Sequence, residues 1–182
     1  MPSRYEEIEL DKVNLHSIDA RESLVGINDI PEPSRLSQSE ADKILESFPP
    51  ILAGNELRAL IDSLRKTREK GTPRIWTMGA HPVKVGISRH IIALMEEGFI
   101  THLATNGAGI IHDSEMACFG HTSEDVAATI HEGKFSVTRE TGEIINSAAK
   151  MAVEDELGLG EAVGQSLQDS NPPHLDVCLS AA

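Results

Sequence analysis

Aromatic residues and cysteines are scarce in this 182-residue sequence. Aromatic residues make up 3% of it, so we expect an aliphatic core of the kind that packs helices on a parallel sheet. The two cysteines, Cys118 and Cys178, lie too far apart for a disulfide framework or a zinc motif. The N-terminal residues lack the apolar core of a signal peptide, and no apolar run approaches the roughly 20 residues that span a bilayer. We therefore expect a cytoplasmic protein with reduced thiols and no membrane partner.

Basic residues are also few. The chain has 16 Lys and Arg against 29 Asp and Glu, which gives a net charge of −13. Because a phosphate backbone requires a basic footprint, we expect no nucleic-acid partner. The contents of hydrophobic residues (40%) and charged residues (25%) are typical of a globular protein. A chain of this length is sufficient for one domain with a sizeable core.

Helical signals alternate with short apolar runs along most of the chain. Residues 1–35 are polar and irregular, and we expect an N-terminal arm in which 23–30 is either a short strand or extended chain. The domain is expected to begin at residue 36. Amphipathic spacing and capping residues predict helices at about 39–48, 55–70, 87–98, 110–119 and 138–156. A short helix is expected within 124–133, after the capping residues Thr122 and Ser123. Residues 159–167 also have helical character.

Three apolar segments, 74–80, 99–106 and 174–182, are interpreted as strands, and 81–86 as a loop. Strands that alternate with helices indicate a parallel sheet with right-handed crossovers. The expected fold is α/β, a Rossmann-like parallel sheet with flanking helices over residues 36–182. Three strands are few for such a sheet, and the last one reaches the end of the sequence. We therefore expect this sheet to be incomplete at its C-terminal end and the chain to be an N-terminal fragment.

Two loops follow the first two predicted strands, at 78–86 and 106–113. Ligands of open parallel sheets bind beyond the carboxyl ends of the strands. Gly107, Ala108 and Gly109 separate a strand from a helix start, where backbone N–H groups and the helix dipole favour a phosphate. Lys84 in the first loop is suited to an anion, and His81 to proton transfer. The spacing differs from G-x-G-x-x-G, so a tight turn without a ligand is the alternative.

A metal site is the other interpretation of the histidine-rich segment. His112, Asp113, Glu115, Cys118 and His121 lie within ten residues, and His112 and Glu115 share one face of a helix. Histidine pairs at i and i+4, as in zinc hydrolases, are absent. We therefore expect no metal, and a metal-assisted hydrolase that uses His112, Asp113 and His121 is the weakest of the alternatives.

Two segments together, AHPVKVGIS (80–88) and ATNGAGIIHD (104–113), resemble the deoxyhypusine synthase family. The resemblance covers about residues 70–120. It implies an NAD-binding Rossmann-like domain, a homotetramer, and transfer of an aminobutyl group through a lysine. The matching positions are Thr105, Gly109 and Asp113, with Gly86 and Ile87 at a helix entry.

Several positions depart from the family. Ile111 and His112 replace two consecutive glutamates, His81 and Pro82 replace a Ser-Asn pair, and the lysine would lie beyond residue 182. We expect an NAD-dependent transferase that acts on an amine or another small substrate. Its cofactor site would comprise Thr105, Asn106, Gly107, Ala108, Gly109, Lys84 and Gly86, and its catalytic residues would be His112, Asp113 and His81. The main alternative is a non-catalytic Rossmann-like assembly module or an inactive fragment.

Overall fold

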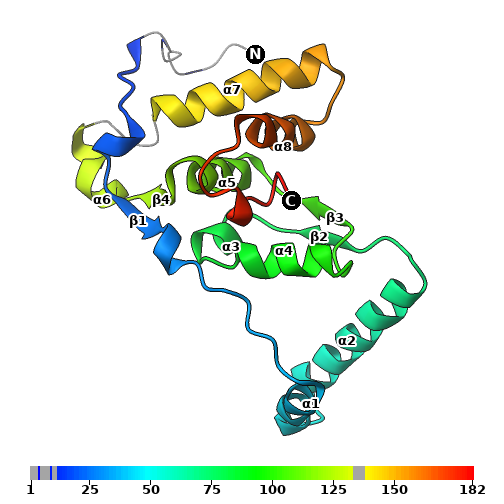
Figure 1. Ribbon diagram of the computed structural model, residues 1–182. Helices are drawn as coiled ribbons and strands as arrows, with labels where there is room; N and C mark the ends of the chain where they lie inside the picture. Colours follow the sequence, from blue (N-terminus) through cyan, green and yellow to red (C-terminus); the bar gives the residue numbers. More distant parts are fainter. Residues whose placement is uncertain (1–3, 5–8, 10–11, 133–137) are drawn as a thin grey trace.

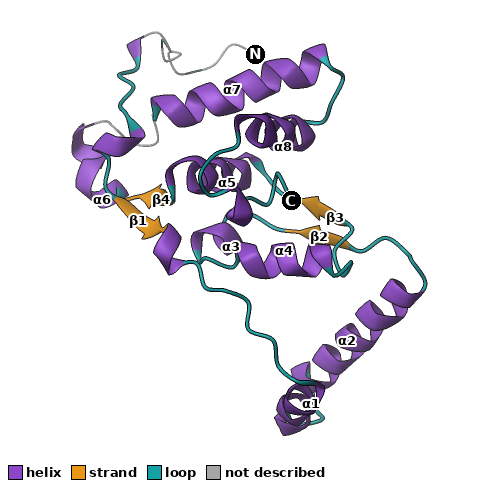
Figure 2. Cartoon of the chain, viewed as in Figure 1, coloured by secondary structure: helices purple, strands orange, loops and turns teal. Residues whose placement is uncertain are grey.

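A computed structural model describes residues 4, 9, 12–132 and 138–182, which form a mixed α/β arrangement (Figures 1 and 2). The strands form two separate two-stranded sheets. The α-helices of this part are α1 (Gln38–Ser47), α2 (Ala53–Glu69), α3 (His81–Lys84), α4 (Ser88–Glu96), α5 (Gly107–Phe119), α6 (Val126–Thr129), α7 (Arg139–Glu154) and α8 (Leu159–Ser170). The strands are β1 (Ser23–Gly26), β2 (Ile75–Thr77), β3 (His102–Ala104) and β4 (His121–Glu124), and short 3-10 helices are η2 (Ile18–Ala20), η3 (Ile27–Asp29), η4 (Ile130–Glu132) and η5 (Leu175–Val177).

The two sheets differ in direction. β2 and β3 are parallel, with Ile75 opposite His102, which confirms the strands predicted within 74–80 and 99–106. β1 and β4 are antiparallel, with Val25 opposite Thr122. Of the two alternatives for residues 23–30, a short strand or extended chain, the strand is confirmed for residues 23–26. β4 was not predicted, because Thr122 in this polar strand was interpreted as preceding a helix.

Helix α5 lies at the centre of the packed part of the chain. Seven of its residues are buried. Ile110 and Ala117 pack with Val163 and Leu167 of α8, and Met116 packs with Val177 near the C-terminus. Burial of one such aliphatic side chain stabilises the fold by about 1.5–3 kcal/mol. The residues on the remaining faces of α5 are therefore held in fixed positions.

The prediction of a buried strand at 174–182 is wrong. Residues 175–177 form η5, and the chain then turns under α5. The backbone N–H groups of Leu179 and Ser180 donate to the carboxylate of Asp113 at 2.8 Å each, instead of to a strand. The apolar run there is short, and a short apolar run does not distinguish a strand from other buried chain.

The predicted loop at 81–86 is also wrong in part, because His81–Lys84 form one turn of helix, α3, with Pro82 in its first turn. Proline is well tolerated there, since its fixed φ suits the start of a helix. The predicted amphipathic helices correspond to α1, α2, α4 and α7, and α5 begins three residues earlier than expected. The helix predicted within 124–133 is α6 followed by η4, and residue 133 lies outside the described residues.

Helices α1 and α2 lie away from the other helices, with α1 across the N-terminal end of α2 (Figure 1). Ser37 caps α1 with Glu40 in a reciprocal capping box. The guanidinium of Arg58 in α2 donates to the carbonyl oxygens of Leu45 and Phe48, which ties the end of α1 to α2. No helix in the described part of the chain has the length and apolarity needed to cross a membrane.

Candidate functional site

A cavity of about 500 Å³ lies against one face of α5. Ala108, Ile111, His112 and Glu115 of α5 line it, at the helical spacing that places side chains on one face. The other walls come from the N-terminal segment, α3, β4 and α7. Residues from five separate parts of the sequence therefore meet around this space.

A buried ion pair forms the floor of this cavity. Arg21 donates to both carboxylate oxygens of Glu115, at 3.0 Å and 2.6 Å, and the two side chains are 5% and 3% exposed. Thr122 and Thr141 donate their hydroxyls to the same carboxylate at 2.6 Å and 2.8 Å. Burial alone would raise the pKa of Glu115, but these hydrogen bonds outweigh it and lower the pKa. Glu115 is therefore an ionised and fully bonded carboxylate that holds its neighbours in place.

The hydrogen bonds of Thr122 determine the tautomer of His112. A threonine hydroxyl has one proton, and Thr122 gives it to the acceptor-only carboxylate of Glu115. The oxygen of Thr122, 2.7 Å from His112 Nδ1, must then accept a proton from that nitrogen. Nε2 of His112 consequently carries the lone pair.

Burial is the main reason that the pKa of His112 lies below its ordinary value, and nearby Lys84 and Arg21 lower it further against the opposing effect of Glu115. His112 is therefore neutral at pH 7. Within the described part of the chain, Nε2 has no hydrogen-bond partner. An oriented, neutral imidazole of this kind is suited to accept a proton from a bound molecule.

Ser123 adds an unpaired hydroxyl to the cavity wall. The residue is 6% exposed, and its Oγ has no hydrogen-bond partner among the described residues. Its φ of 63° lies in the left-handed region, which is uncommon for residues other than glycine. Buried polar groups usually have partners, so this unpaired hydroxyl is an exception beside the cavity.

The structure brings together only part of the predicted site. Lys84, Ala108 and His112 line the cavity. Asn106 caps the adjoining N-terminus of α5, where its side-chain oxygen accepts from the N–H of Gly109 at 3.1 Å. Gly107 begins the helix with open space where a Cβ would be.

Other predicted residues have visible structural roles. A Cβ on Gly109 would lie 2.1 Å from Thr105 Oγ1, so this glycine allows the Thr105 side chain to pack on the helix. Gly86 has a φ of 78° in the turn before α4, where a Cβ would approach the carbonyl oxygen of Asp29 to 3.0 Å. His81 is exposed at the start of α3. None of these four residues lines the cavity.

Asp113 lies in the buried interior rather than at the cavity. Its carboxylate accepts from the N–H groups of Leu179 and Ser180, the hydroxyl of Ser180 and the thiol of Cys178. Burial raises the pKa of Asp113, although these hydrogen bonds oppose the shift. The contacts assign this carboxylate to anchoring the C-terminal residues.

The described residues contain no group of three or more His, Cys, Asp or Glu side chains arranged to hold a metal ion. Of the three residues considered for a metal-assisted hydrolase, Asp113 is occupied by the C-terminal residues and His121 bonds Ser23 Oγ at 2.9 Å. The geometry therefore gives that alternative no support.

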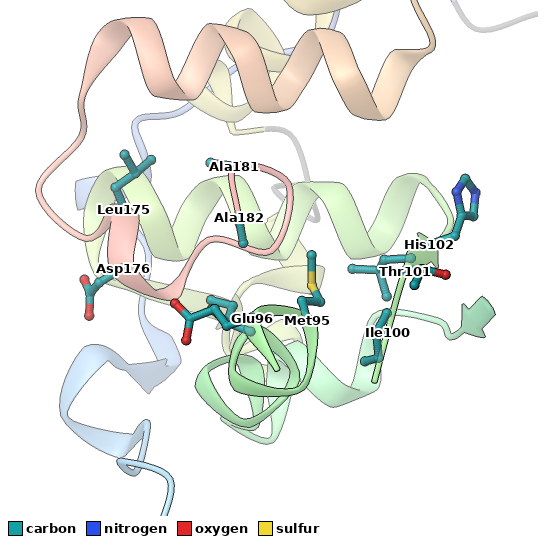
Figure 3. A pocket seen from close by; sticks show the side chains of 11 residues that line it. Met95, Glu96, Ile100, Thr101, His102, Leu175, Asp176, Ala181 and Ala182 are labelled. Atoms are coloured by element: carbon teal, nitrogen blue, oxygen red, sulfur yellow. The ribbon is translucent and has the colours of Figure 1, made fainter. Parts of the chain in front are cut away.

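A second cavity, of about 640 Å³, opens between α4, β3 and the C-terminal residues (Figure 3). Figure 3 shows Met95 and Ile100 between the carboxylates of Glu96 and Asp176 on one side and His102 on the other. Asp176 is paired with Arg89 at 2.6 Å. None of the predicted catalytic or cofactor residues lines this cavity, so the cavity at His112 is the better candidate site.

Sequence reasoning missed Arg21 and Ser123 as members of the site. Arg21 meets Glu115 across 94 residues of sequence, and no local pattern marks such a pair. The sequence did indicate that Glu115 shares a helix face with His112. Comparison of the chain with protein-family models, curated proteins and solved structures found no match in any of the three.

Proposed function

We propose that this chain is an NAD-binding protein of the deoxyhypusine synthase-like group. In this proposal it is an NAD-dependent transferase that acts on an amine or another small substrate, and the parallel β2–β3 pair belongs to a Rossmann-like sheet. The observation that carries the proposal is one cavity that joins the N-terminus of α5, Lys84 and the oriented imidazole of His112.

The residues around the start of α5 are suited to the pyrophosphate of NAD. This helix follows a strand of a parallel pair, the place where such ligands bind. The first N–H groups of a helix have no partners within it and carry a partial positive charge. The open space at Gly107 lets a phosphate approach these groups, and the ammonium of Lys84 would supply a full charge.

The side chains beyond the helix start would serve the substrate. NAD, when bound, supplies a hydride acceptor. His112 would take a proton from the substrate at Nε2, because Thr122 holds its Nδ1–H. Glu115 and Arg21 would keep this arrangement fixed without touching the substrate. By the same resemblance we propose a homo-oligomer, with a tetramer as the expected form, and a cytoplasmic location.

The test is NAD binding, measured by titration calorimetry on the 182-residue chain and two variants of one position. Because a Cβ at Gly107 meets nothing within 4 Å beyond its own turn of helix, and aspartate is well tolerated at a helix N-terminus, both variants should fold. Gly107→Asp places a negative charge where the phosphate would bind, and should weaken binding at least about tenfold. Gly107→Ala is the matched control, with affinity close to wild type.

Two results would contradict the NAD assignment. One is the absence of binding by the wild-type chain, which would favour the non-catalytic assembly module. The other is equal affinity of the aspartate and alanine variants, which would place NAD elsewhere. His112→Gln should leave NAD binding intact, since this residue is assigned to the substrate.

A further inference from the structure

Asn106 and Gly107 form an exposed dipeptide at the start of α5. Of the six asparagines in the sequence, Asn106 alone precedes a glycine. Because glycine has no side chain, its backbone nitrogen is open to the amide group of the residue before it. Both residues are exposed, and a Cβ at Gly107 would meet nothing within 4 Å beyond its own turn of helix. The dipeptide is therefore open to solvent and free to move locally.

The backbone nitrogen of Gly107 is a nucleophile within reach of the Asn106 side chain. Gly107 is the first residue of α5, so its N–H lies outside the hydrogen-bond ladder of the helix. No acceptor for this N–H lies in the described part of the chain. The positive end of the helix dipole favours loss of the proton from this nitrogen. The ring that it would close onto Cγ of Asn106 consists of atoms of the dipeptide itself.

The side-chain amide of Asn106 is the matching electrophile. Its Oδ1 accepts a hydrogen bond from the backbone N–H of Gly109 at 3.1 Å. This bond draws electrons from Cγ and stabilises the negative charge that Oδ1 gains when Cγ is attacked, as the donors of an oxyanion hole do. Nδ2 has no acceptor among the described residues, so no hydrogen bond opposes its departure.

Asn146 provides a contrast within the same molecule. It is also exposed, and it precedes a small residue, Ser147. Asn146 lies in the middle of α7, however, where the N–H of Ser147 belongs to the hydrogen-bond ladder of the helix. Attack on Cγ of Asn146 would require that turn of helix to open. The backbone therefore protects Asn146 and leaves Asn106 reactive.

We propose that Asn106 is a site of spontaneous deamidation. The nitrogen of Gly107 gives its proton to hydroxide and attacks Cγ of Asn106. The bond from Cγ to Nδ2 then breaks, and Nδ2 takes up a proton and leaves as ammonia. The product is a cyclic succinimide, which water opens at either of its two carbonyl carbons to give aspartate or isoaspartate. The net reaction converts an amide and water into a carboxylate and ammonium, without oxidation or reduction.

The two products differ in their effect on α5. Aspartate caps a helix as well as asparagine does, and its negative charge is favourable at a helix N-terminus, so this product keeps the helix start. Isoaspartate routes the main chain through the side-chain methylene, which displaces the capping oxygen from Gly109. Both products place a negative charge beside the first N–H groups of α5. A resulting loss of NAD affinity rests on the proposed function, whereas the reaction itself does not.

The experiment compares the rates of deamidation at Asn106 and Asn146 in the 182-residue chain. Folded chain and chain unfolded in guanidinium chloride are incubated at about pH 8 and 37 °C, then digested and analysed by mass spectrometry. We expect folding to slow the reaction at Asn146 at least about tenfold and to change the rate at Asn106 less than about threefold. Isoaspartate at position 106, separated by chromatography, identifies the succinimide route.

Gly107→Ala is the matched variant, because its methyl group hinders attack by the backbone nitrogen and meets no other part of the chain. It should slow deamidation at Asn106 at least about tenfold and leave the rate at Asn146 unchanged. Circular dichroism confirms that the variant keeps its helices. Three results would overturn the proposal: folding that protects Asn106 as strongly as Asn146, aspartate at position 106 without isoaspartate, or equal rates at Asn106 in wild type and Gly107→Ala.

Discussion

Removal of the Glu115 carboxylate is the sharpest test of how the candidate site is held together. In Glu115→Leu, the guanidinium of Arg21 stays buried and loses both of its carboxylate contacts. Breaking a buried ion pair from one side costs about 3–5 kcal/mol, a large part of the 5–15 kcal/mol that stabilises a typical protein. The hydroxyls of Thr122 and Thr141 lose their acceptor as well.

Urea unfolding followed by circular dichroism at pH 7 measures this cost. With a slope of about 2 kcal/mol per molar, a loss of about 4 kcal/mol lowers the midpoint by about 2 M. The double variant Arg21→Met, Glu115→Leu should be more stable than Glu115→Leu, because no charge is left buried alone. Glu143→Leu, at an exposed position of α7, is the control and should change stability by less than about 0.5 kcal/mol.

The reasoning would be refuted if Glu115→Leu cost less than about 1 kcal/mol, or if the double variant were the less stable of the two. Either result would mean that the pair is solvated, or that the two side chains do not interact across the cavity floor.

Two further predictions concern α5. In Gly109→Ala the new Cβ meets Thr105 Oγ1, so we expect the free energy of unfolding, measured by the same urea assay, to fall by about 1–3 kcal/mol. A second substitution, Thr105→Ala, should recover part of this loss. A Gly109→Ala variant more stable than wild type would disprove the clash. The lowered pKa of His112 means that the unfolded chain takes up a proton first as the pH falls. Its contribution to stability is present above its ordinary pKa of 6.5 and is lost as the pH falls through the folded pKa. Stability should therefore drop more between pH 7.5 and 5.5 in wild type than in His112→Gln, and equal drops would count against the burial of this imidazole.

Helices with strong periodicity could be predicted from the sequence. The stripe from Leu57 to Leu64 predicted α2, and the Gly-Ala-Gly turn before His112 predicted the start of α5 to within three residues. These features are local, since a helix forms its hydrogen bonds within its own segment. The pairing of β2 with β3 followed from the alternation of strands and helices.

The remaining features depend on contacts between distant residues. No sequence pattern around Arg21 marks it as a site residue, because its role depends on the ion pair that it forms with Glu115. The polar strand β4 has no apolar alternation that would mark it as a strand. The apolar run near Cys178 is buried against α5 instead of pairing in a sheet. His112 was singled out from the sequence, but its tautomer depends on Thr122 of β4, a strand that was not predicted.

The two buried carboxylates of α5 have a consequence for how the chain folds. Asp113 and Glu115 lie two residues apart, yet the donors of one come from residues 178–180 and the charge partner of the other from residue 21. During synthesis the N-terminal partner is present early, whereas the donors of Asp113 are made 65 to 67 residues after it. Until then Asp113 cannot be buried without the loss of its solvation. Completion of the core therefore depends on contacts of long sequence separation, and folding should be slow for a protein so rich in helix.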